Sequence, residues 1–434
     1  MALTPFFFPD KTGNSVFSID APRIKFGAGS LAEAGWDAKA LGLKRVALIV
    51  DPAIRTLPPF EVLTTSLDGA GVEYTIFDRI VIEPTERSML DAVEFANEVK
   101  PDGFISLGGG STIDTAKVAN LLSTYPADLK TYVNKPLGDA TPPPGPLKPH
   151  IACPTTFGTA SETTGIAIFD FLELNTKTGI AHRHLKPTLG VLDPNCLESL
   201  PPLVLAANGF DVFSHAIESL TARSHRRHPV PDDPSTRPLS QGSNPFSDLH
   251  CLEAIKIIGE TLVKAVHSPS EATRENLMFA GMLAGLGFGN AGCHIPHGMS
   301  YAVAGLVRDY YPEGWRTNTA MAPHGIAVIV NAPAVLRLLS SMQPDLMAKA
   351  ATVLSIDLEE IEPDYAGDLV ADRLVEMMRE CEIPNGLMGL GFTEEDIDAL
   401  TEKTMPQRRL LDNAPMILEE QHIRGLFEGA MRYW

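Results

Sequence analysis

Cysteine is scarce in this chain, and no two cysteines form a C-x-x-C pair. The 434 residues contain five cysteines, an odd number spread over the whole length. This usage argues against a disulfide scaffold and against paired-cysteine zinc or redox motifs, and it suits buried thiols in a reducing compartment. We therefore expect a cytoplasmic protein in which all five remain free thiols: Cys153, Cys196, Cys251, Cys293 and Cys381.

Long apolar runs are also missing. No run approaches the roughly 20 residues that a membrane-spanning helix needs. The first eleven residues, MALTPFFFPDK, show neither the basic and apolar regions with a cleavage site typical of a signal peptide nor the Arg-rich pattern of a mitochondrial presequence. The sequence thus predicts no membrane segment and no targeting segment, and it favours the cytoplasm.

Positive charge is in deficit. The chain has 35 Lys and Arg against 54 Asp and Glu, a formal net charge of −19. Nucleic-acid binding depends on clustered positive charge, so this balance argues against a nucleic-acid partner. It leaves room for a small anionic substrate, because such a site needs only one or two local cations. We expect a small-molecule substrate.

The first half of the chain alternates strand-like and helix-like segments. Residues 45–50, 73–77 and 103–107 are short β-prone runs, and residues 88–99 and 112–122 carry apolar side chains at helical spacing. Residues 151–154, 167–169 and 188–192 are further expected strands. Alternating strands and helices predict a parallel sheet covered on both faces.

After about Pro194 the pattern becomes helical. The expected helices cover residues 203–222, 247–267, 270–286, 346–354, 367–381 and 393–404. Residues 224–245, rich in Pro, Arg, His, Asp and Ser, predict a long surface loop between two of them. We expect an α/β dinucleotide-binding domain over residues 1–195 and an all-α metal-binding and substrate domain over residues 196–434.

A glycine-rich turn follows the strand at 103–107. Gly108, Gly109, Gly110 and Ser111 stand where that strand ends and a helix begins. Glycine lets the backbone approach a ligand closely, and a helix N-terminus offers N–H groups to a pyrophosphate. A tight turn without a ligand is the alternative, since the run is not the G-x-G-x-x-G motif.

Two more stretches carry groups that suit a nucleotide. Residues 154–164 are dense in hydroxyls, including those of Thr155, Thr156 and Thr159, which could bond a ribose or phosphate or merely cap the next helix. Asp51 ends its strand, where a carboxylate could accept from a ribose 2′-OH and favour NAD over NADP. Aspartate is also common in turns, so a turn without a ligand is the alternative for Asp51.

Several residues have spacings that suit a divalent cation. Asp211 and His215 are four apart and lie on one helix face. Further along the chain stand His294, His297 and His324, of which the last two are each followed by glycine. Three imidazoles and one carboxylate suit Fe²⁺ or Zn²⁺ and leave room for a substrate oxygen. A surface ion pair and helix-ending turns are the alternatives.

Taken together, these motifs resemble the iron-containing (group III) alcohol dehydrogenases over nearly the whole chain. The resemblance rests on the triglycine turn, the 154–162 loop, Gly209 to Glu218, His297-Gly298-Met299 and Pro323-His324-Gly325, in that order. Residues 236–245, 287–292 and 297–301, with the long loop, resemble the hydroxyacid–oxoacid transhydrogenase branch. The implied fold is that of the dehydroquinate synthase-like and iron-containing alcohol dehydrogenases, with cofactor and metal in the cleft between its domains.

Carried over residue by residue, the resemblance implies an assignment for each site. The implied metal ligands are Asp211, His215, His297 and His324, and His294 is left out because the family motif aligns on His297. The implied cofactor is NAD(H), and its positions are Asp51, Gly109, Gly110, Ser111, Thr155, Thr156, Thr159 and Lys177. The expected catalytic residues are His297 and Tyr301. We also expect a homo-oligomer, a dimer.

Two departures from the family pattern matter. Many members carry a second histidine four residues after the third ligand, where this chain has Tyr301, so a proton relay from those enzymes does not transfer directly. The loop at 224–245 is absent from simple alcohol dehydrogenases.

The implied reaction moves hydride from a 3- or 4-hydroxy acid such as 4-hydroxybutanoate to NAD, and then to a 2-oxo acid such as 2-oxoglutarate. A conventional NAD-dependent alcohol dehydrogenase, a maleylacetate-reductase-like enzyme and a non-catalytic nucleotide-binding module are the alternatives. A carboxylate substrate needs a cation, for which the candidates are Arg183, Lys186, Arg237 and Arg308.

Overall fold

The computed structural model describes residues 14–172, 176–315, 317 and 319–434. These residues form two units, one of residues 20–200 and one of residues 201–434 joined by residues 14–19. Residues 14–19 join the second unit in part through Ser18, whose N–H donates to Gln241 Oε1 at 2.9 Å. The boundary between the units thus lies five residues beyond the one drawn from the sequence. The N-terminal residues 1–11, from which the absence of a targeting segment was inferred, lie outside the described residues.

The first unit is built on a parallel six-stranded sheet. Its order is β1-β8-β5-β4-β2-β3, and every pairing is parallel. The four inner strands are buried along all or nearly all of their length, which is typical of strands covered on both faces. The strand bounds are β1 Arg23–Phe26, β2 Arg45–Val50, β3 Glu73–Phe77, β4 Gly103–Gly108, β5 His150–Pro154 and β8 Leu189–Leu192.

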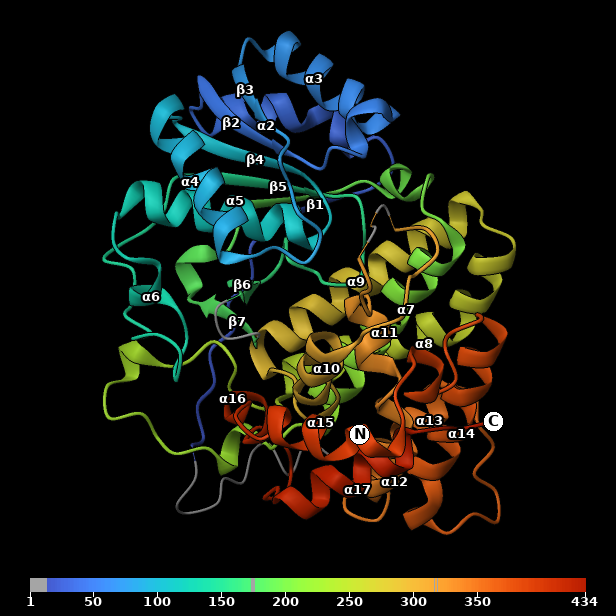
Figure 1. Ribbon diagram of the computed structural model, residues 1–434. Helices are drawn as coiled ribbons and strands as arrows, with labels where there is room; N and C mark the ends of the chain where they lie inside the picture. Colours follow the sequence, from blue (N-terminus) through green and yellow to red (C-terminus); the bar gives the residue numbers. More distant parts are fainter. Residues whose placement is uncertain (1–13, 173–175, 316, 318) are drawn as a thin grey trace. The chain divides into compact units, whose positions relative to one another are not determined.

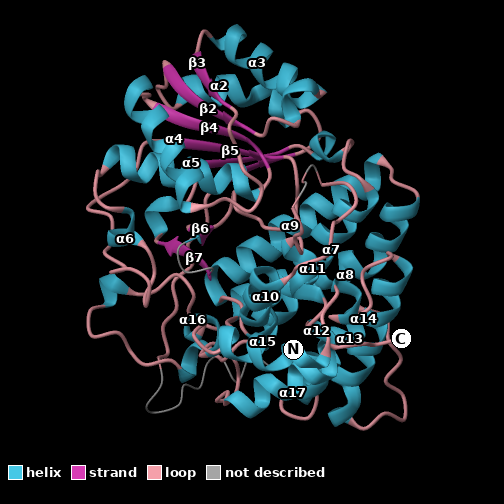
Figure 2. Ribbon diagram, in the orientation of Figure 1, coloured by secondary structure: helices cyan, strands magenta, loops and turns pink. Residues whose placement is uncertain are grey.

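Helices cover both faces of this sheet (Figures 1 and 2). Helices α2 (Ala34–Ala40) and α3 (Pro58–Ala70) pack on one face, and α4 (Glu86–Val99) and α5 (Gly110–Thr124) pack on the other. Along β2, Leu48 packs toward α2 and α3, whereas Ala47 and Ile49 pack toward α4 and α5. The period of two along a strand thus supplies two cores. The expected doubly covered α/β sheet is confirmed.

One expected strand belongs elsewhere. The segment predicted at 167–169 is part of β6 (Ile166–Phe171), which pairs antiparallel with β7 (Thr176–Ala181) in a separate two-stranded sheet. The predicted strand is confirmed, and it lies outside the parallel sheet because β7 is close in sequence and antiparallel strands need only a short connection. The hairpin is tied to α5, where Asp114 Oδ2 accepts from the Ile168 N–H at 2.9 Å. The short helix α6 (Leu129–Tyr132) packs into the same apolar cluster.

The sheet order creates a switch point beside β4. From β2 the chain passes through α3 to β3 at one edge, whereas from β4 it continues to β5 on the other side. In open α/β sheets, ligands bind at the carboxyl ends of the strands where the order reverses in this way. The carboxyl ends of β2 and β4 carry Asp51 and the triglycine turn.

The second unit is helical in all its described elements. Its central helix, α7 (Pro202–Thr221), is buried on nearly every side and packs against α8 and α9, which also pack against each other. A helix apolar all round is one that belongs inside. The remaining bounds are α8 Pro245–His267, α9 Glu271–Ala291, α10 Ile295–Leu306, α11 His324–Ile329, α12 Ala332–Leu339, α13 Pro344–Val353, α14 Ala366–Glu380, α15 Ile397–Thr404, α16 Arg408–Leu411 and α17 Glu420–Ala430.

The long connection predicted between two helices is present between α7 and α8. It contains two short 3-10 helices, at His225–Arg227 and Pro234–Thr236. The Ser243 N–H donates to Arg223 O at 3.1 Å and the His225 N–H donates to Ser243 O at 3.0 Å. These bonds tie the two ends of the loop together. Asn244 then caps α8 by accepting from the Ser247 N–H at 3.1 Å.

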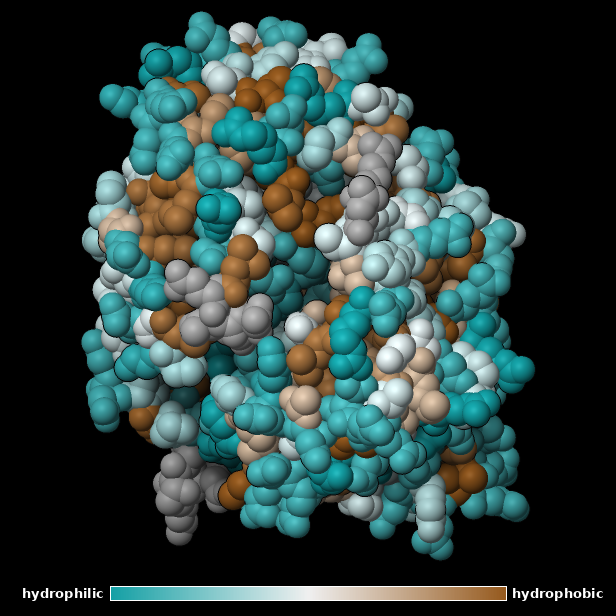
Figure 3. Space-filling model, in the orientation of Figure 1, coloured by the Kyte–Doolittle hydropathy of each residue, from teal (hydrophilic) through white to brown (hydrophobic). Residues whose placement is uncertain are grey.

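The hydrophilic surface and the free thiols agree with the charge and the cysteine content of the sequence. Most of the face seen in Figure 3 is hydrophilic, with hydrophobic residues in separate patches. All five cysteines are free and buried, as expected. Among the described residues, no helix combines the length and the apolar character needed to cross a bilayer.

A glycine on α11 allows α11 and α7 to approach closely. A Cβ placed on Gly325 would lie 2.0 Å from the Ala207 carbonyl oxygen of α7. We expect Gly325→Ala to lower the free energy of unfolding by about 1–3 kcal/mol, because a backbone must shift to admit the methyl group. Urea unfolding of the purified protein measures this change.

The matched control is Gly425→Ala on α17, where a Cβ meets nothing within 4 Å. There the same substitution should raise stability by roughly 0.5–1 kcal/mol, since glycine is a poor helix former. Equal effects of the two substitutions would show that the α7–α11 approach is not tightly packed.

Candidate functional site

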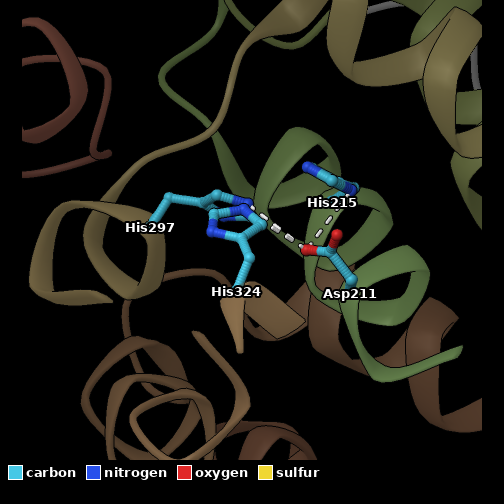
Figure 4. Close-up of side chains that lie close together, drawn as sticks. All are labelled: Asp211, His215, His297 and His324. Atoms are coloured by element: carbon cyan, nitrogen blue, oxygen red, sulfur yellow. Dashed lines mark ion pairs between the residues drawn. The ribbon is translucent and has the colours of Figure 1, made fainter. Parts of the chain in front are cut away.

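The four predicted metal ligands converge in the helical unit. Asp211 and His215 come from the middle of α7, His297 from the first turn of α10 and His324 from the first residue of α11. Their side chains face one another in Figure 4. One ligand atom from each lies within 4.8 Å of the others. Three separate segments of the chain thus deliver three imidazoles to one carboxylate.

The distances in this cluster suit a shared ion better than hydrogen bonds. Asp211 Oδ1 lies 3.7 Å from His215 Nδ1, 3.7 Å from His297 Nε2 and 3.7 Å from His324 Nε2. Hydrogen bonds between such atoms are shorter than about 3.2 Å. Ligands held about 2.1 Å from a tetrahedral ion stand roughly 3.4 Å apart. The spacing therefore leaves room for a cation at the centre.

Three of these atoms are also buried without a hydrogen-bond partner, namely Asp211 Oδ1, His215 Nδ1 and His297 Nε2. Leaving a buried polar atom unpaired costs about 1–3 kcal/mol, so three in contact need an explanation. A divalent cation satisfies all of them at once. The donor set, three nitrogens and one carboxylate oxygen, is one that Fe²⁺ and Zn²⁺ accept.

Glu218 fixes the orientation of His297, and the sequence analysis did not identify it as a site residue. It is 1% exposed and stands one turn beyond His215 on α7. Its Oε1 lies 2.6 Å from His297 Nδ1, and its Oε2 accepts from the His294 N–H at 2.7 Å. Burial raises the pKa of Glu218, but His297 and His294 more than offset this and lower it. The group is therefore a carboxylate.

The consequence is a defined tautomer for His297. An ionised carboxylate only accepts, so Nδ1 carries the proton and donates to Glu218. The Nε2 lone pair is then directed at Asp211, where a ligand is needed. A second possible trio, Glu218, Cys293 and His297, is not an open ion site, because this hydrogen bond already joins two of its members. The i, i+4, i+7 spacing of Asp211, His215 and Glu218 was the sequence signal for this residue.

His294 has a different role from His297. Its Nδ1 accepts from the Ile295 N–H at 2.7 Å, and its Nε2 lies 2.9 Å from Thr221 Oγ1. Both ring nitrogens are therefore engaged. Burial lowers the pKa of His294 to about 4, so the ring is neutral at pH 7. His294 caps α10 and links it to α7.

Phe288 packs against one candidate ligand, and Tyr301 follows another on the same helix. The His215 ring stacks on Phe288 of α9, with ring centroids 4.0 Å apart and planes 9° apart. Tyr301, the predicted catalytic residue, lies on α10 one turn after His297 and is 9% exposed. The ligand cluster is thus walled by an aromatic ring from the neighbouring helix.

In the sheet unit, the triglycine turn lies against the threonine-rich loop. A Cβ on Gly109 would lie 3.2 Å from Thr156 Oγ1, and one on Gly110 would lie 2.7 Å from Thr159 Oγ1. The N–H groups of Gly110 and Ser111 come before the first helical hydrogen bond of α5, which Thr112 donates to Gly109 at 3.0 Å. The turn is therefore a helix N-terminus whose first N–H groups precede the helical hydrogen bonds and whose glycines lie against two threonine hydroxyls, which fits a pyrophosphate.

The remaining nucleotide candidates from the strand ends lie beside this turn. The Asp51 N–H donates to Leu107 O at 3.1 Å, and the Thr155 N–H donates to Gly108 O at 3.0 Å. Asp51 Oδ1 accepts from the Ala53 N–H at 2.8 Å, which leaves its other oxygen for a ligand. Asp51, the glycines and Thr155 thus stand on three adjacent strands, at the switch point of the sheet.

A buried lysine holds the threonine-rich loop in place. Lys117 Nζ donates to Ser161 Oγ at 2.6 Å and to Ile166 O at 2.6 Å, and it lies 3.3 Å from Asp114 Oδ1. Its side chain is completely buried. Ser161 also bonds to Asp114. This explains why Asp114 and Lys117 follow the glycines at fixed spacing: they position the loop that faces the turn.

Lys177 is engaged differently from the other cofactor candidates. It lies on β7, where its Nζ is 2.5 Å from Glu83 Oε2 and 3.0 Å from Asp170 Oδ1. Burial lowers the pKa of Lys177, but the two carboxylates more than offset this and raise it. The ammonium is thus fixed by protein carboxylates on the hairpin, whereas the other cofactor candidates lie on the strand ends and their loops.

Two of the four candidate cations for a substrate carboxylate have protein partners in the helical unit. Arg237 Nη1 donates to Val16 O at 2.8 Å, and Arg308 Nη2 lies 2.7 Å from Asp396 Oδ1. Arg183 and Lys186 lie in the sheet unit, both near Asp20.

Comparison with known proteins gives the family. Residues 21–194 match the model of the iron-containing alcohol dehydrogenases, and residues 239–431 match the model of the C-terminal region of the Fe-containing alcohol dehydrogenase family. Together the two matches cover most of the chain.

Full-length relatives point to one branch. A protein named mitochondrial hydroxyacid-oxoacid transhydrogenase from Bos taurus is 41% identical over 427 residues, which cover 98% of this chain and 92% of that one. The human protein of the same name is 40% identical over 98% of this chain and 91% of its own. A protein named as a probable enzyme of this kind in Dictyostelium discoideum is 39% identical, covering 96% and 79%.

Solved structures share the fold. A 1,3-propanediol oxidoreductase superposes with a TM-score of 0.84 at 26% identity, covering 96% of this chain and all of that chain. An alcohol dehydrogenase from Oenococcus oeni gives 0.83 at 24% identity, with the same coverage. The expected α/β plus all-α fold is confirmed.

These relatives also correct one expectation. The prediction of a cytoplasmic protein is wrong, because the relatives that match nearly all of this chain are named as mitochondrial. One premise was the pattern of residues 1–11, which lie outside the described residues. The other was free, buried thiols, and these suit any reducing compartment, so they do not distinguish the cytoplasm from other such compartments.

The resemblance found in the sequence is therefore confirmed by family models over both units and by relatives of 40% identity over almost the whole length. The chain belongs to the iron-containing alcohol dehydrogenase family and is an oxidoreductase.

Proposed function

We propose that the chain is a hydroxyacid–oxoacid transhydrogenase of the mitochondrion. It oxidises a small hydroxy acid, such as 3- or 4-hydroxybutanoate, and passes the hydride through a retained NAD(H) to 2-oxoglutarate. The observation that carries the proposal is the 40–41% identity to proteins of that name over 98% of the chain. The ligand cluster and the glycine turn supply the two sites that the reaction needs.

The proposed metal ligands are Asp211, His215, His297 and His324. Their support is the set of unpaired buried atoms and the 3.7 Å spacing around Asp211 Oδ1. The ion is Fe²⁺ or Zn²⁺, since both accept this donor set. Glu218 holds His297 in the tautomer that can bind a cation.

For the dinucleotide, we propose the sheet unit as its binding domain. The N–H groups of Gly110 and Ser111 bind the pyrophosphate, and Gly109 leaves space for it. Thr155, Thr156 and Thr159 bond its sugar and phosphate oxygens, and Asp51 accepts from the adenosine ribose. Lys177 contributes to dinucleotide binding through its positive charge on the hairpin, because Glu83 and Asp170 hold its ammonium group in place.

When bound, the cation supplies Lewis acidity toward a substrate oxygen and the nicotinamide supplies hydride transfer. The chain's own residues orient the reactants and exclude water. Phe288 and the buried walls of α7 and α10 keep the surroundings of the ligand cluster apolar. Tyr301 offers a hydroxyl one turn from His297, in the position where many relatives of the wider family carry a histidine, and we assign to it the transfer of the substrate proton.

Two statements about organisation stay predictions. The residues up to 195 are assigned to dinucleotide binding and those from 196 to metal and substrate binding. The chain is expected to form a homodimer, which light scattering of the purified protein measures.

The main alternative is a conventional NAD-dependent alcohol dehydrogenase that exchanges its cofactor. Its support is the fold shared with alcohol dehydrogenases. A maleylacetate-reductase-like enzyme is a further alternative, and NADH oxidation in the presence of maleylacetate tests it.

The proposed reaction predicts turnover without free NAD. Purified protein given 4-hydroxybutanoate and 2-oxoglutarate should form 2-hydroxyglutarate, because the cofactor cycles on the enzyme. Chromatography of the products measures it. His324→Gln should lower the rate by roughly two orders of magnitude or more, since a ligand is lost, whereas His422→Gln on α17 should leave it unchanged. Turnover that needs added NAD and ignores the oxo acid would support the conventional dehydrogenase instead.

The role given to Glu218 predicts a loss of metal affinity in Glu218→Gln. The glutamine amide cannot accept from both the His297 Nδ1–H and the His294 N–H, so His297 loses its fixed orientation. Zinc affinity, measured by competition with a chromophoric chelator, should fall roughly 10–100-fold. Glu253→Gln, an exposed position on α8, removes the same charge and should have no effect. Unchanged affinity in Glu218→Gln would disprove the positioning role.

Asp51 should set the preference between NADH and NADPH. Asp51→Asn removes the charge that repels a 2′-phosphate but keeps the acceptor for the Ala53 N–H, so the local turn survives. We expect the ratio of the NADPH and NADH dissociation constants, measured by fluorescence titration, to shift toward NADPH by about tenfold. Asp68→Asn on α3 is the control for lost charge. A ratio equal to that of the unmodified protein would place the ribose elsewhere.

A further inference from the structure

A second site of unusual composition lies at the opposite end of the parallel sheet. A cavity of about 170 Å³ opens beside the amino ends of β5 and β8, lined by residues of α5 and of the segments at 146–150 and 183–188. The triglycine turn, by contrast, follows the carboxyl end of β4. The cavity is therefore separate from the candidate nucleotide site and lies entirely within the sheet unit.

Basic residues dominate this cavity, although the chain as a whole carries a net charge of −19. Its lining contains Lys117, Lys148, Arg183 and Lys186 with two histidines, and no carboxylate. Asp20 lies close by, 3.9 Å from Arg183 and 3.5 Å from Lys186, so two cations share one carboxylate. Asp114 similarly balances Lys117. Asp102 acts on Lys148 and Glu162 acts on Lys117 in the same way, so the lining itself carries only cations and the carboxylates that balance them stand outside it.

Two buried nitrogens in the lining have no hydrogen-bond partner. They are His150 Nδ1 and His184 Nδ1. His150 is 2% exposed, and its Nε2 lies 2.8 Å from the hydroxyl of Ser106. Buried polar atoms without a hydrogen-bond partner also mark the metal ligands in the other unit.

The hydrogen bonds of His150 indicate what its free nitrogen needs. Ser106 is fully buried, and within the described residues His150 Nε2 is the one acceptor found for its hydroxyl. If the hydroxyl donates to Nε2, the ring proton resides on Nδ1. Burial and the nearby Lys117 lower the pKa of His150 to about 3, so the ring carries one proton only. The wall of the cavity therefore holds a buried N–H donor without an acceptor.

The lining is also rigid. Asn120 of α5 binds the backbone of Lys148 on both sides: its Nδ2 donates to Lys148 O at 2.8 Å and its Oδ1 accepts from the Lys148 N–H at 3.2 Å. Thr188 Oγ1 accepts from the His150 N–H at 3.2 Å. The backbone of Lys148 and of His150 is thus held in position before any ligand arrives, which lowers the entropic cost of binding.

We propose that this cavity binds a small oxyanion with two or more negative charges, such as phosphate or a di- or tricarboxylate. Lys148, for which no ion pair is found among the described residues, and the Nδ1–H of His150 are its principal donors. Arg183 and Lys186 add charge from the opposite segment. Charge-assisted hydrogen bonds of this kind are among the strongest that proteins make. The inference does not depend on the proposed reaction.

Calorimetric titration of the full-length protein with phosphate, citrate and chloride tests the proposal. Phosphate, citrate or both should bind with a defined stoichiometry. Tighter binding of phosphate would indicate a phosphoryl ligand, and tighter binding of citrate would indicate a polycarboxylate. Lys148→Gln should weaken that binding by tenfold or more. Lys44→Gln, an exposed change at the amino end of β2 on the same edge of the sheet, should alter it less than twofold. Thermal melting without anion verifies that both variants are folded.

Crystals soaked in selenate locate the bound ion through its anomalous signal. Density next to His150 Nδ1 supports the proposal. The proposal is overturned if selenate is found solely at the Gly110–Ser111 turn or on the exposed surface, or if the cavity contains water alone. It is also overturned if chloride matches phosphate and citrate, or if Lys148→Gln binds as tightly as Lys44→Gln.

Discussion

The helical unit is organised around a buried carboxylate that faces three imidazoles at 3.7 Å each. At that distance the groups do not satisfy one another by hydrogen bonds, yet all are held there by packed helices. Such an arrangement is costly in an empty interior and favourable around a divalent cation. Much of the surrounding structure keeps these groups in place: the all-round burial of α7, the approach of α11 to α7 at Gly325, and the bond from Glu218 to His297.

Glu218 links folding to chemistry in this unit. One carboxylate oxygen orients the His297 ring, and the other accepts the backbone N–H of His294 at the start of α10. The same side chain therefore positions the helix that delivers a ligand and selects the tautomer of that ligand. Because both oxygens are used and the group is buried, neither glutamine nor a shorter acid reproduces its two contacts.

The sheet unit solves a different problem, the close approach of a backbone to an anionic ligand. Its glycine turn lies against the hydroxyls of Thr156 and Thr159 in the threonine-rich loop. Lys117 holds this loop in place through its hydrogen bond to Ser161. At the other end of the same sheet, the cavity around His150 gathers cations in an acidic chain. One end of the sheet offers an anion the N–H groups of a helix, and the other end offers it charged side chains.

The sequence by itself determined the local patterns and the chemistry of the site. Apolar runs predicted the buried strands, and apolar residues at helical spacing predicted the long helices α7 to α9. The spacing of Asp211 and His215 placed two ligands on one helix face. These features depend on periodicity alone. The family resemblance added His297 and His324. Tertiary structure decided what depends on distant partners. The 166–171 segment pairs with β7 and not with the parallel sheet, and helices α10 and α11 were not predicted. Each carries a candidate ligand histidine in its first turn, and both pack against α7. The role of Glu218 and the basic cavity emerged only in three dimensions, since the first depends on the atoms that Glu218 contacts and the second on buried nitrogens that lack a partner.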